Sequence, residues 1–556
     1  MFVRTLRRKH TDNVVVQIVR SFRNDDGKPR QELIRSLGSA PPGPALDALL
    51  ALAEVEKQQI LSQQSPALFP SEVIADGIIA ARQRKEAGRP LPIADARQLE
   101  GEDIVKLGVH EVFGRMYDEL GLDAIWPARQ AVSARVFRQV VLARLALPGR
   151  SKRGQVKRLS DYGVELPLDR VYRMMDQLNE FKERDLSAHL DGVVRGLLGT
   201  AVEVVFVDAT TVAFATEAED GLRRRGFSKD GRPHRSQVVL ALLQTREGLP
   251  VGYRLFPGNT AEVKTLAPAV EELRSRYRVG RMVLVGDAGL FSADNLAQME
   301  EANLDWVVAA RLRSMGRKDF ESLGSWEDWP AQEADAKGRV RRMISRTIGG
   351  RRLVVRYCPR HARRSVRLRD KAVERAKVRL KNARPGKFLT LATGSLRLNR
   401  EAIQRDAQYD GLHAVWTSLS EAEASDAQVR THYAELWRIE QGFRVMKHTL
   451  KLRPVFHWTE RRVRAHILIC YTAFALMRLL RYRYLQQHST QAPLSEDRIL
   501  EELDRVRVSI VRDHSSRRRF VLPFPPNREQ TLLYRTVGLT LRRSTVLLSS
   551  PKKPRP

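Results

Sequence analysis

Two short apolar runs that each lead into an aspartate constrain the fold of this sequence most. The first run, VEVVFVDA, reaches Asp208, and the second, MVLVGDAG, reaches Asp287. Apolar runs of this length that are rich in valine predict buried β-strands. A carboxylate at the end of a buried strand costs stability unless it binds something. We therefore expect two strands of one sheet to present a pair of carboxylates at the same edge.

The segments around these runs alternate between strand and helix patterns. The runs SQVVLALLQ and GLPVGYRLF follow the first strand, with Gly248 and Pro250 in the connection between them, and predict an antiparallel meander. Helical spacing then appears in AEVKTLAPAVEELRSRY and DNLAQMEEAN, on either side of the strand that leads to Asp287, before a last run, LDWVVAARL. This order predicts an α/β fold with a mixed sheet covered by helices.

A third acid, Glu440, lies in a long stretch of helical spacing, SDAQVRTHYAELWRIEQGFRVMKHTL. A single helix would place Glu440 beside an apolar stripe of Leu436, Phe443 and Met446, and so on its inward side. A hard divalent cation such as Mg²⁺ takes a few carboxylate ligands of this kind. Two Mg²⁺ ions held by the three acids, with Mn²⁺ as a substitute, could activate a nucleophile and stabilise the leaving oxygen at a phosphodiester.

The same helix carries side chains suited to binding DNA phosphates. Tyr433 lies seven positions before Glu440 and Lys447 seven positions after it, so all three would share one face. Tyr433 and Lys447 could each bind a phosphate beside the metal ions. Arg438 lies close by. For Arg444, four positions from Glu440, an ion pair with that acid and a DNA contact are equal alternatives.

The charge of the chain indicates a polyanionic partner. It has 97 Lys and Arg against 65 Asp and Glu, a formal net charge of +32, and such an excess is typical of proteins that bind nucleic acid. Residues 339–387 alone hold 19 Lys and Arg against two acids. We expect this segment to bind double-stranded DNA through phosphate contacts made by Arg341, Arg342, Arg351 and Arg352. The affinity should fall steeply with salt.

Other signals limit the class of protein. The two cysteines, Cys358 and Cys470, cannot build a disulfide framework or a cysteine-based zinc site. No run reaches the roughly 18 uninterrupted apolar residues that predict a membrane span. We therefore expect a soluble protein of the cytoplasm with no membrane partner.

At 556 residues the chain exceeds what one hydrophobic core supports. Its basic helical stretch at 130–175 suits a helix-turn-helix docked on DNA, and a plain helical bundle packed on its neighbour is an equal alternative.

The patterns predict six segments: 1–100, a small β unit, helix and linker; 101–199, an α-helical DNA-binding domain; 200–312, the first part of the catalytic core; 313–405, a basic β-rich insertion; 406–490, the second part of the core with the helix of Glu440; and 491–556, a basic C-terminal region.

These features resemble the DDE transposases of bacterial insertion sequences. Tyr433, Glu440 and Lys447 have the spacing of the group marked by a Tyr, Arg, Glu and Lys signature, with Leu436 in the Arg position. The segments RSQVVLALLQTREGLPVGYRLFPGNTAEVKTL, DAGLFSADNL and LRPVFHW are similar as well. The resemblance implies an RNase H-like catalytic core, a β-rich insertion between Asp287 and Glu440, and a homodimer that brings two DNA ends together.

The leading hypothesis is a transposase that binds the terminal inverted repeats of its element, cleaves the DNA at each end in a metal-dependent reaction, and joins the ends to target DNA, acting beside the nucleoid. One alternative is a metal-dependent nuclease of the same fold that cuts but does not join. Another is a DNA-binding regulator without catalytic activity. Retention of all three acids favours catalysis, and Leu436 weighs weakly against it.

Overall fold

The computed structural model of the chain describes residues 1–7, 13–24, 28–41, 44–64, 99–198, 204–214, 217–227, 234–261, 264–265, 268, 283–287, 289, 292–301, 304–332, 341–381, 386–392, 395–514 and 519–548. The chain forms two compact units. One comprises Met1–Asp103, Ser509–Pro523 and Arg543–Pro556, and the other comprises Ile104–Val508 and Phe524–Arg542.

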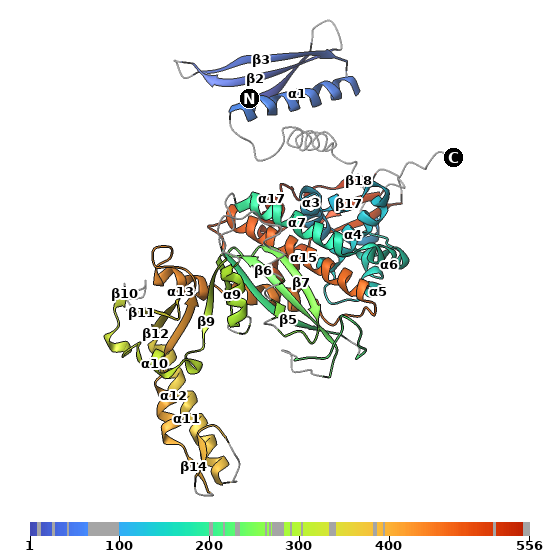
Figure 1. The fold of residues 1–556 in the computed structure, drawn as a ribbon. Coiled ribbons are helices and arrows are strands. Elements are labelled where there is room, and N and C mark those ends of the chain that lie inside the picture. The colour runs from blue at the N-terminus through green and yellow to red at the C-terminus, as the bar shows by residue number, and fades with distance from the viewer. Residues whose placement is uncertain are drawn as a thin grey trace. The chain divides into compact units, whose positions relative to one another are not determined.

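The N-terminal unit contains the predicted small β unit. Strands β1 (Phe2–Arg7), β2 (Val14–Arg23) and β3 (Pro29–Ala40) form an antiparallel sheet, and helix α1 (Pro44–Gln64) packs on it (Figure 1). A small core of Val3, Val16, Ile18 and Ala53 joins helix and sheet. A second sheet has the order β18-β17-β16-β4 and is formed by β4 (Leu99–Lys106), β16 (Arg507–Asp513), β17 (Arg519–Pro523) and β18 (Val546–Leu548).

The larger unit is built on a mixed sheet, as the sequence predicted. Strand β5 (Val204–Ala213) pairs antiparallel with β6 (Gln237–Thr245), which pairs antiparallel with β7 (Pro250–Pro257). On its other side β5 pairs parallel with β8 (Val283–Gly286), which pairs parallel with β9 (Asp305–Ala310). Helix α9 (Ala293–Glu301) connects the last two strands. Most of the other predicted helix, in AEVKTLAPAVEELRSRY, lies outside the described residues.

The predicted β-rich insertion extends this sheet, and β15, in the second part of the core, lies between its strands and β9. Strands β10 (Ala331–Gln332), β11 (Arg341–Ile348), β12 (Arg351–Tyr357) and β15 (Leu412–Thr417) continue the sheet in the order β10-β11-β12-β15-β9. Gly349 and Gly350 form the β11–β12 turn with φ of 57° and 78°, the positive values that a two-residue hairpin turn needs.

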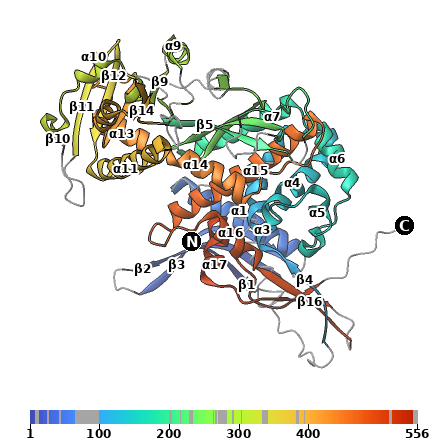
Figure 2. The same cartoon turned by 90° about the horizontal axis from the view of Figure 1, so that it is seen from below.

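The rest of the insertion is mainly helical. Helix α11 (Pro359–Lys381) packs against β14 (Ser395–Leu398) and α12 (Arg400–Ala407), and β13 (Leu389–Ala392) pairs with β14 (Figures 1 and 2). Strands β10, β11 and β12 therefore join the insertion to the core sheet, whereas α11, α12 and the β13–β14 pair form its outer part.

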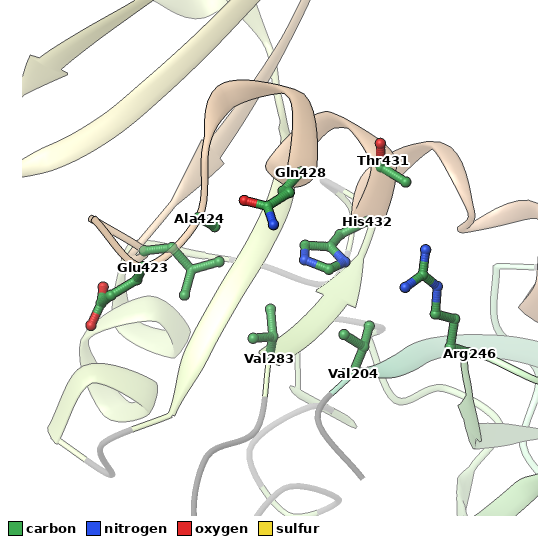
Figure 3. Close-up of a pocket in the computed structure, with 9 residues that line it drawn as sticks. Val204, Arg246, Val283, Glu423, Ala424, Gln428, Thr431 and His432 are labelled. Atoms are coloured by element: carbon green, nitrogen blue, oxygen red, sulfur yellow. The ribbon is translucent and has the colours of Figure 1, made fainter. Parts of the chain in front are cut away.

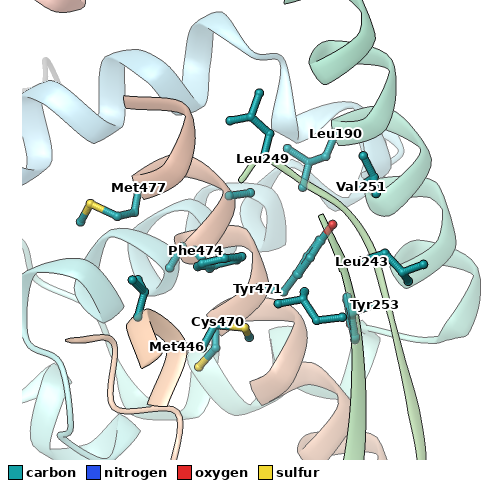
Figure 4. Packing of buried hydrophobic residues seen from close by; sticks show 14 of the residues in the cluster. Leu190, Leu243, Leu249, Val251, Tyr253, Met446, Cys470, Tyr471, Phe474 and Met477 are labelled. Carbon is teal, nitrogen blue, oxygen red and sulfur yellow. The ribbon is translucent and has the colours of Figure 1, made fainter. Parts of the chain in front are cut away.

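Helix α15 (Glu460–Gln487) is the centre of the main hydrophobic core. In Figure 4, Tyr471 of α15 lies against Tyr253 of β7, with ring centroids 4.5 Å apart. Among the described residues, α15 is the one helix long and apolar enough to cross a membrane, but 94% of its most apolar window is buried inside the protein. It is thus a core helix, and the helices packed on it or on β7 include α3 (Gly108–Glu119), α4 (Ala131–Ala146), α6 (Leu168–Gln177) and α7 (Glu180–Leu198).

The helix predicted around Glu440 is broken. It consists of α13 (Asp426–Ala434), α14 (Trp437–Arg444) and a π-helical turn at Val445–Thr449. Ser425 caps α13 with a capping box. The prediction of one continuous helix was therefore wrong, and so was the shared face that it assigned to the signature residues.

Candidate active site

Asp208 and Asp287 occupy equivalent places on two neighbouring parallel strands. The register pairs Val204 with Val283 and Phe206 with Val285, so each aspartate lies four residues beyond the first pair. Neighbouring strands lie about 4.8 Å apart, and residues level with each other point to the same face. The two carboxylates therefore stand side by side, as the apolar runs predicted.

One detail of the prediction for Asp208 was wrong, because it does not end its strand. Strand β5 continues to Ala213, paired with β6 along its whole length, whereas β8 stops at Gly286, just before Asp287. Asp208 is thus half-buried within β5 at the point where its parallel neighbour ends, and Asp287 is exposed. The backbone N–H of Ala209 donates to Asp208 Oδ1 at 2.7 Å, which helps to hold that carboxylate.

Glu440 lies in the first turn of α14, which packs on β5 and β6 (Figure 2). The residues of α14 that face the sheet are Ile439, Gly442 and Phe443. Glu440 itself is exposed, so its predicted place on the inward stripe was wrong.

Tyr433 is influenced by two acids, Asp287 and Glu440, that lie 153 positions apart in the sequence. Burial raises the pKa of the half-buried Tyr433 hydroxyl, the Asp287 carboxylate raises it further, and Glu440 adds to this, while Arg430 opposes it. One hydroxyl therefore lies within electrostatic reach of two of the three acids. The phenol stays protonated at neutral pH and can donate a hydrogen bond.

Lys447 lies beside the strand that carries the first acid. Its Nζ donates to Thr210 Oγ1 at 2.5 Å. Thr210 follows Asp208 by two residues in β5, and alternate residues of a strand share a face. The structure thus brings Asp208, Asp287, Tyr433, Glu440 and Lys447 to one region.

The two other basic residues of the signature segment have different surroundings. Arg438 pairs with Glu435 at 3.3 Å, and Glu435 also receives Arg246 of the loop after β6 at 2.7 Å. Sequence reasoning missed Arg246, since nothing in its own segment marks it. Arg444 is exposed, and among the described side chains it does not form the ion pair with Glu440 that its spacing allowed.

Three of the four arginines expected to contact DNA have partners within the protein. Arg352 is 8% exposed and donates to Leu419 O and Ala424 O as well as pairing with Asp426. Other groups hold the remaining two: Arg342 donates to the carbonyls of Glu327 and Trp329, and Arg351 pairs with Glu300 at 2.9 Å. Arg341 begins β11, and its side chain lies outside the described residues.

The donor set of the site suits a hard cation. All three acids offer carboxylate oxygens, which Mg²⁺ and Mn²⁺ prefer, and two of them stand side by side. In the described part of the chain no three His, Cys, Asp or Glu side chains lie close enough together to hold a metal ion. The exposed Glu440 side chain would have to approach the aspartate pair to complete the ligands.

A separate cavity of about 450 Å³ lies at the other end of the strands. Val204 and Val283, the first residues of β5 and β8, line it together with the half-buried His432 (Figure 3). It is therefore distinct from the acid site, which lies four residues further along both strands.

Two family models match the chain. The model described as "Transposase DDE domain" matches residues 201–477, and the one described as "IS1634 family transposase, N-terminal domain" matches residues 3–64. The chain is a DDE transposase of the insertion-sequence type. Its mixed sheet with helices agrees with the predicted α/β class, and the predicted enzyme class, a DDE transposase, is confirmed. DDE transposases act on DNA and generally use divalent metal ions.

Solved transposases show distant similarity. A synaptic complex of the piggyBac transposase with hairpin DNA is 12% identical, covers 71% of this chain and 76% of its own, and has a TM-score of 0.37. A Mos1 mariner paired-end complex with Mn is 12% identical, covers 48% of this chain and 78% of its own, and has a TM-score of 0.14. None of the curated proteins compared with the transposase matches it.

Proposed function

We propose that this transposase binds the terminal inverted repeats of its element, hydrolyses a phosphodiester at each end, and joins the freed 3′-hydroxyl to target DNA. Asp208, Asp287 and Glu440 are the proposed catalytic residues. The observation that carries the proposal is the level position of the two aspartates on neighbouring parallel strands, with α14, the helix that bears Glu440, packed on β5.

Each side chain has a proposed task. The three carboxylates hold two divalent ions, Mg²⁺ or Mn²⁺, which when bound activate the attacking oxygen and stabilise the leaving one. The protonated Tyr433 hydroxyl donates to a phosphate oxygen beside Asp287. Lys447, now held by Thr210, can supply a positive charge to the same backbone.

Recognition of the DNA ends is assigned to the helical stretch at 130–175. Its apolar side packs on α15 as a bundle, while Arg150, Arg153 and Lys157 are exposed. These three side chains are suited to phosphate contacts. A homodimer that pairs two ends, in the cytoplasm beside the nucleoid, completes the proposal. Arg438 and Arg444 remain proposed DNA contacts, the former after release from Glu435.

The test is cleavage of a labelled transposon-end duplex in Mg²⁺ or EDTA. Glu440→Gln and Asp208→Asn should each lower the rate at least about a hundredfold, the scale seen when one group that stabilises charge in a transition state is lost. Asp294→Asn is the control, because Asp294 is an exposed acid in the first turn of α9. Normal cutting by Glu440→Gln, or cutting in EDTA, contradicts the three-acid site.

A second assay separates transposase from nuclease. Precut ends are incubated with target DNA, and joined products are counted. Joining by wild type and not by Glu440→Gln supports the full reaction. Cutting without joining favours the nuclease, and binding without either favours the regulator.

A further inference from the structure

A basic groove of about 500 Å³ lies beside the acids, where β9 ends. Its volume is within the range of ligand-binding clefts. No acidic side chain lines it. Its polar and aromatic lining comes from Arg311, Arg313, Tyr409, His413, Arg430 and Tyr433.

The groove begins at the catalytic centre. The register of β8 and β9 pairs Gly286 with Val308, so Asp287 stands level with Ala309, which lines the groove. Tyr433 lines it too. Whatever occupies the groove therefore lies next to the acids.

The positive charge in the groove is only partly balanced within the protein. Arg311 is exposed and, among the described residues, has no side-chain hydrogen bond or ion pair. Arg313 pairs with Asp406 at 3.2 Å and lies over the Tyr409 ring. Burial lowers the pKa of His413 to about 4, with His361, Arg430 and Arg356 adding to this. An arriving anion would meet cations and neutral imidazole, but no carboxylate in the lining.

The far end of the groove meets the first turn of α11. His413 forms a hydrogen bond with His361 of that helix, and their ring centroids are 4.2 Å apart. From there one face of α11 carries a row of exposed cations, the α11 row, at spacings of three or four residues: Arg360, Arg364, Arg367, Lys371 and Arg375. At 1.5 Å per residue the row is about 23 Å long.

The α11 row is built into the insertion. On the opposite side of α11, Arg369 pairs with Asp410 at 2.6 Å and Ala376 is buried. The five cations of the row have no side-chain partner within the described chain. Like charges at i,i+4 destabilise a helix by a few tenths of a kcal/mol per pair, so the row costs stability when nothing is bound to it.

We propose that the groove and the α11 row form one track for the sugar–phosphate backbone of DNA leaving the three acids. The inference rests on the proposed function and names where the DNA runs on one side of the cut. DNA is favoured over an acidic protein because the track starts at a site that acts on phosphodiesters. Cations spaced about 4.5–6 Å apart on a straight helix suit phosphates without reading sequence.

The test measures binding in EDTA, so that it does not depend on cutting. The variants are Arg311→Gln and the pair Arg364→Gln with Arg367→Gln. The matched control is Arg317→Gln with Lys318→Gln, two exposed cations on α10 (Arg317–Glu321) in the same unit. Two series of end duplexes are used, each shortened stepwise from one side of the cleavage point.

The slope of log affinity against log salt should flatten by about 0.9 for each DNA phosphate that the variant no longer neutralises. We expect a change of about 0.9 for Arg311→Gln and about 1.8 for the α11 pair, and none for the control. The difference in salt slope between these variants and wild type should vanish when the duplex is shortened from one side of the cleavage point. It should persist when the duplex is shortened from the other side. Variants that match the control on every duplex overturn the track.

Two further outcomes are decisive. If polyglutamate of matched charge competes with DNA as well as unlabelled duplex does, the surface is a general polyanion surface and the proposal is wrong. If wild type fails to cut in Mg²⁺ while the length-dependent loss of binding is seen, the proposed function fails and the track stands.

Discussion

At the scale of single residues, the half-buried His110 makes the protein sensitive to mild acid. Neither ring nitrogen of His110 has a hydrogen-bond partner among the described residues. Burial lowers the pKa of His110 to about 4, and Arg138 adds to this. The folded-state pKa is thus below the unfolded value of about 6.5. The stability contribution is complete above pH 6.5 and is lost as the pH falls toward 4, because the unfolded chain then binds the extra proton.

His110→Phe should remove this share of the pH dependence. Between pH 6.5 and 4, wild type should lose about 2–3 kcal/mol through His110, and the variant should lose that much less. Denaturant unfolding at a series of pH values measures the difference. His448→Gln, at an exposed position, is the control. If the free energy of unfolding fell equally with pH in wild type and His110→Phe, the His110 ring would take up its proton in the folded state as readily as in the unfolded chain.

The sequence predicts the positions and roles of some residues of the site better than those of others. The aspartate pair is predictable, because an apolar run followed by an acid reports both the strand and its burial. The roles of Arg342, Arg351 and Arg352 are not, because their partners lie in other segments: for Arg352 these are carbonyls and an acid between Leu419 and Asp426. A run of charge in the sequence does not distinguish a solvated cation from one that holds two elements together.

At the scale of elements, the position of α14 decides where Glu440 stands. The break before α14 could not be predicted, since Ala434 to Arg438 are good helix formers and the segment is divided by its tertiary packing. Gly442 is part of that packing. A Cβ atom there would lie 2.0 Å from Nε2 of Gln244, a fully buried side chain of β6. A side chain at that position would force the buried amide of Gln244 to move.

Gly442→Ala should therefore destabilise the protein by about 1–3 kcal/mol, the usual cost of overpacking, and lower cleavage by moving Glu440. Thermal unfolding and the end-cleavage assay measure the two effects. Gly192→Ala is the matched control, because Gly192 is an exposed position of α7 with no atom within 4 Å of the added Cβ. There the change should stabilise the helix by up to about 1 kcal/mol. Equal behaviour of the two variants would contradict the close packing of α14.

At the scale of the whole catalytic unit, the chain leaves the core after β9, builds the insertion, and returns to supply Glu440. The return passes through β15, which pairs with β12 on one side and β9 on the other. Arg352 of β12 fastens the segment that follows β15 and leads to α13. The insertion and the Glu440 segment are thus one connected structure.

Arg352→Met should destabilise this unit by about 2–4 kcal/mol, because it leaves Asp426 without its partner and two carbonyls without their donor. Arg346→Met, at an exposed position of β11, should change stability by less than about 0.5 kcal/mol. Denaturant unfolding gives both values. DNA binding by Arg352→Met, at a temperature where it is folded, should keep the salt slope of wild type. A flattened slope would restore Arg352 as a phosphate contact.

The continuity of the sheet also bears on how such a chain can change over time. Without the insertion at 313–405, β15 would still pair with β9 but would lose β12 and become the edge strand, with its backbone donors and acceptors open to the strands of other molecules. Shortened copies of the gene that lose this segment would give a protein prone to aggregate, even with both aspartates intact. Loss of only the outer part, α11 with β13 and β14, leaves β15 paired with both β12 and β9. We therefore expect natural variation in length to fall within that outer part.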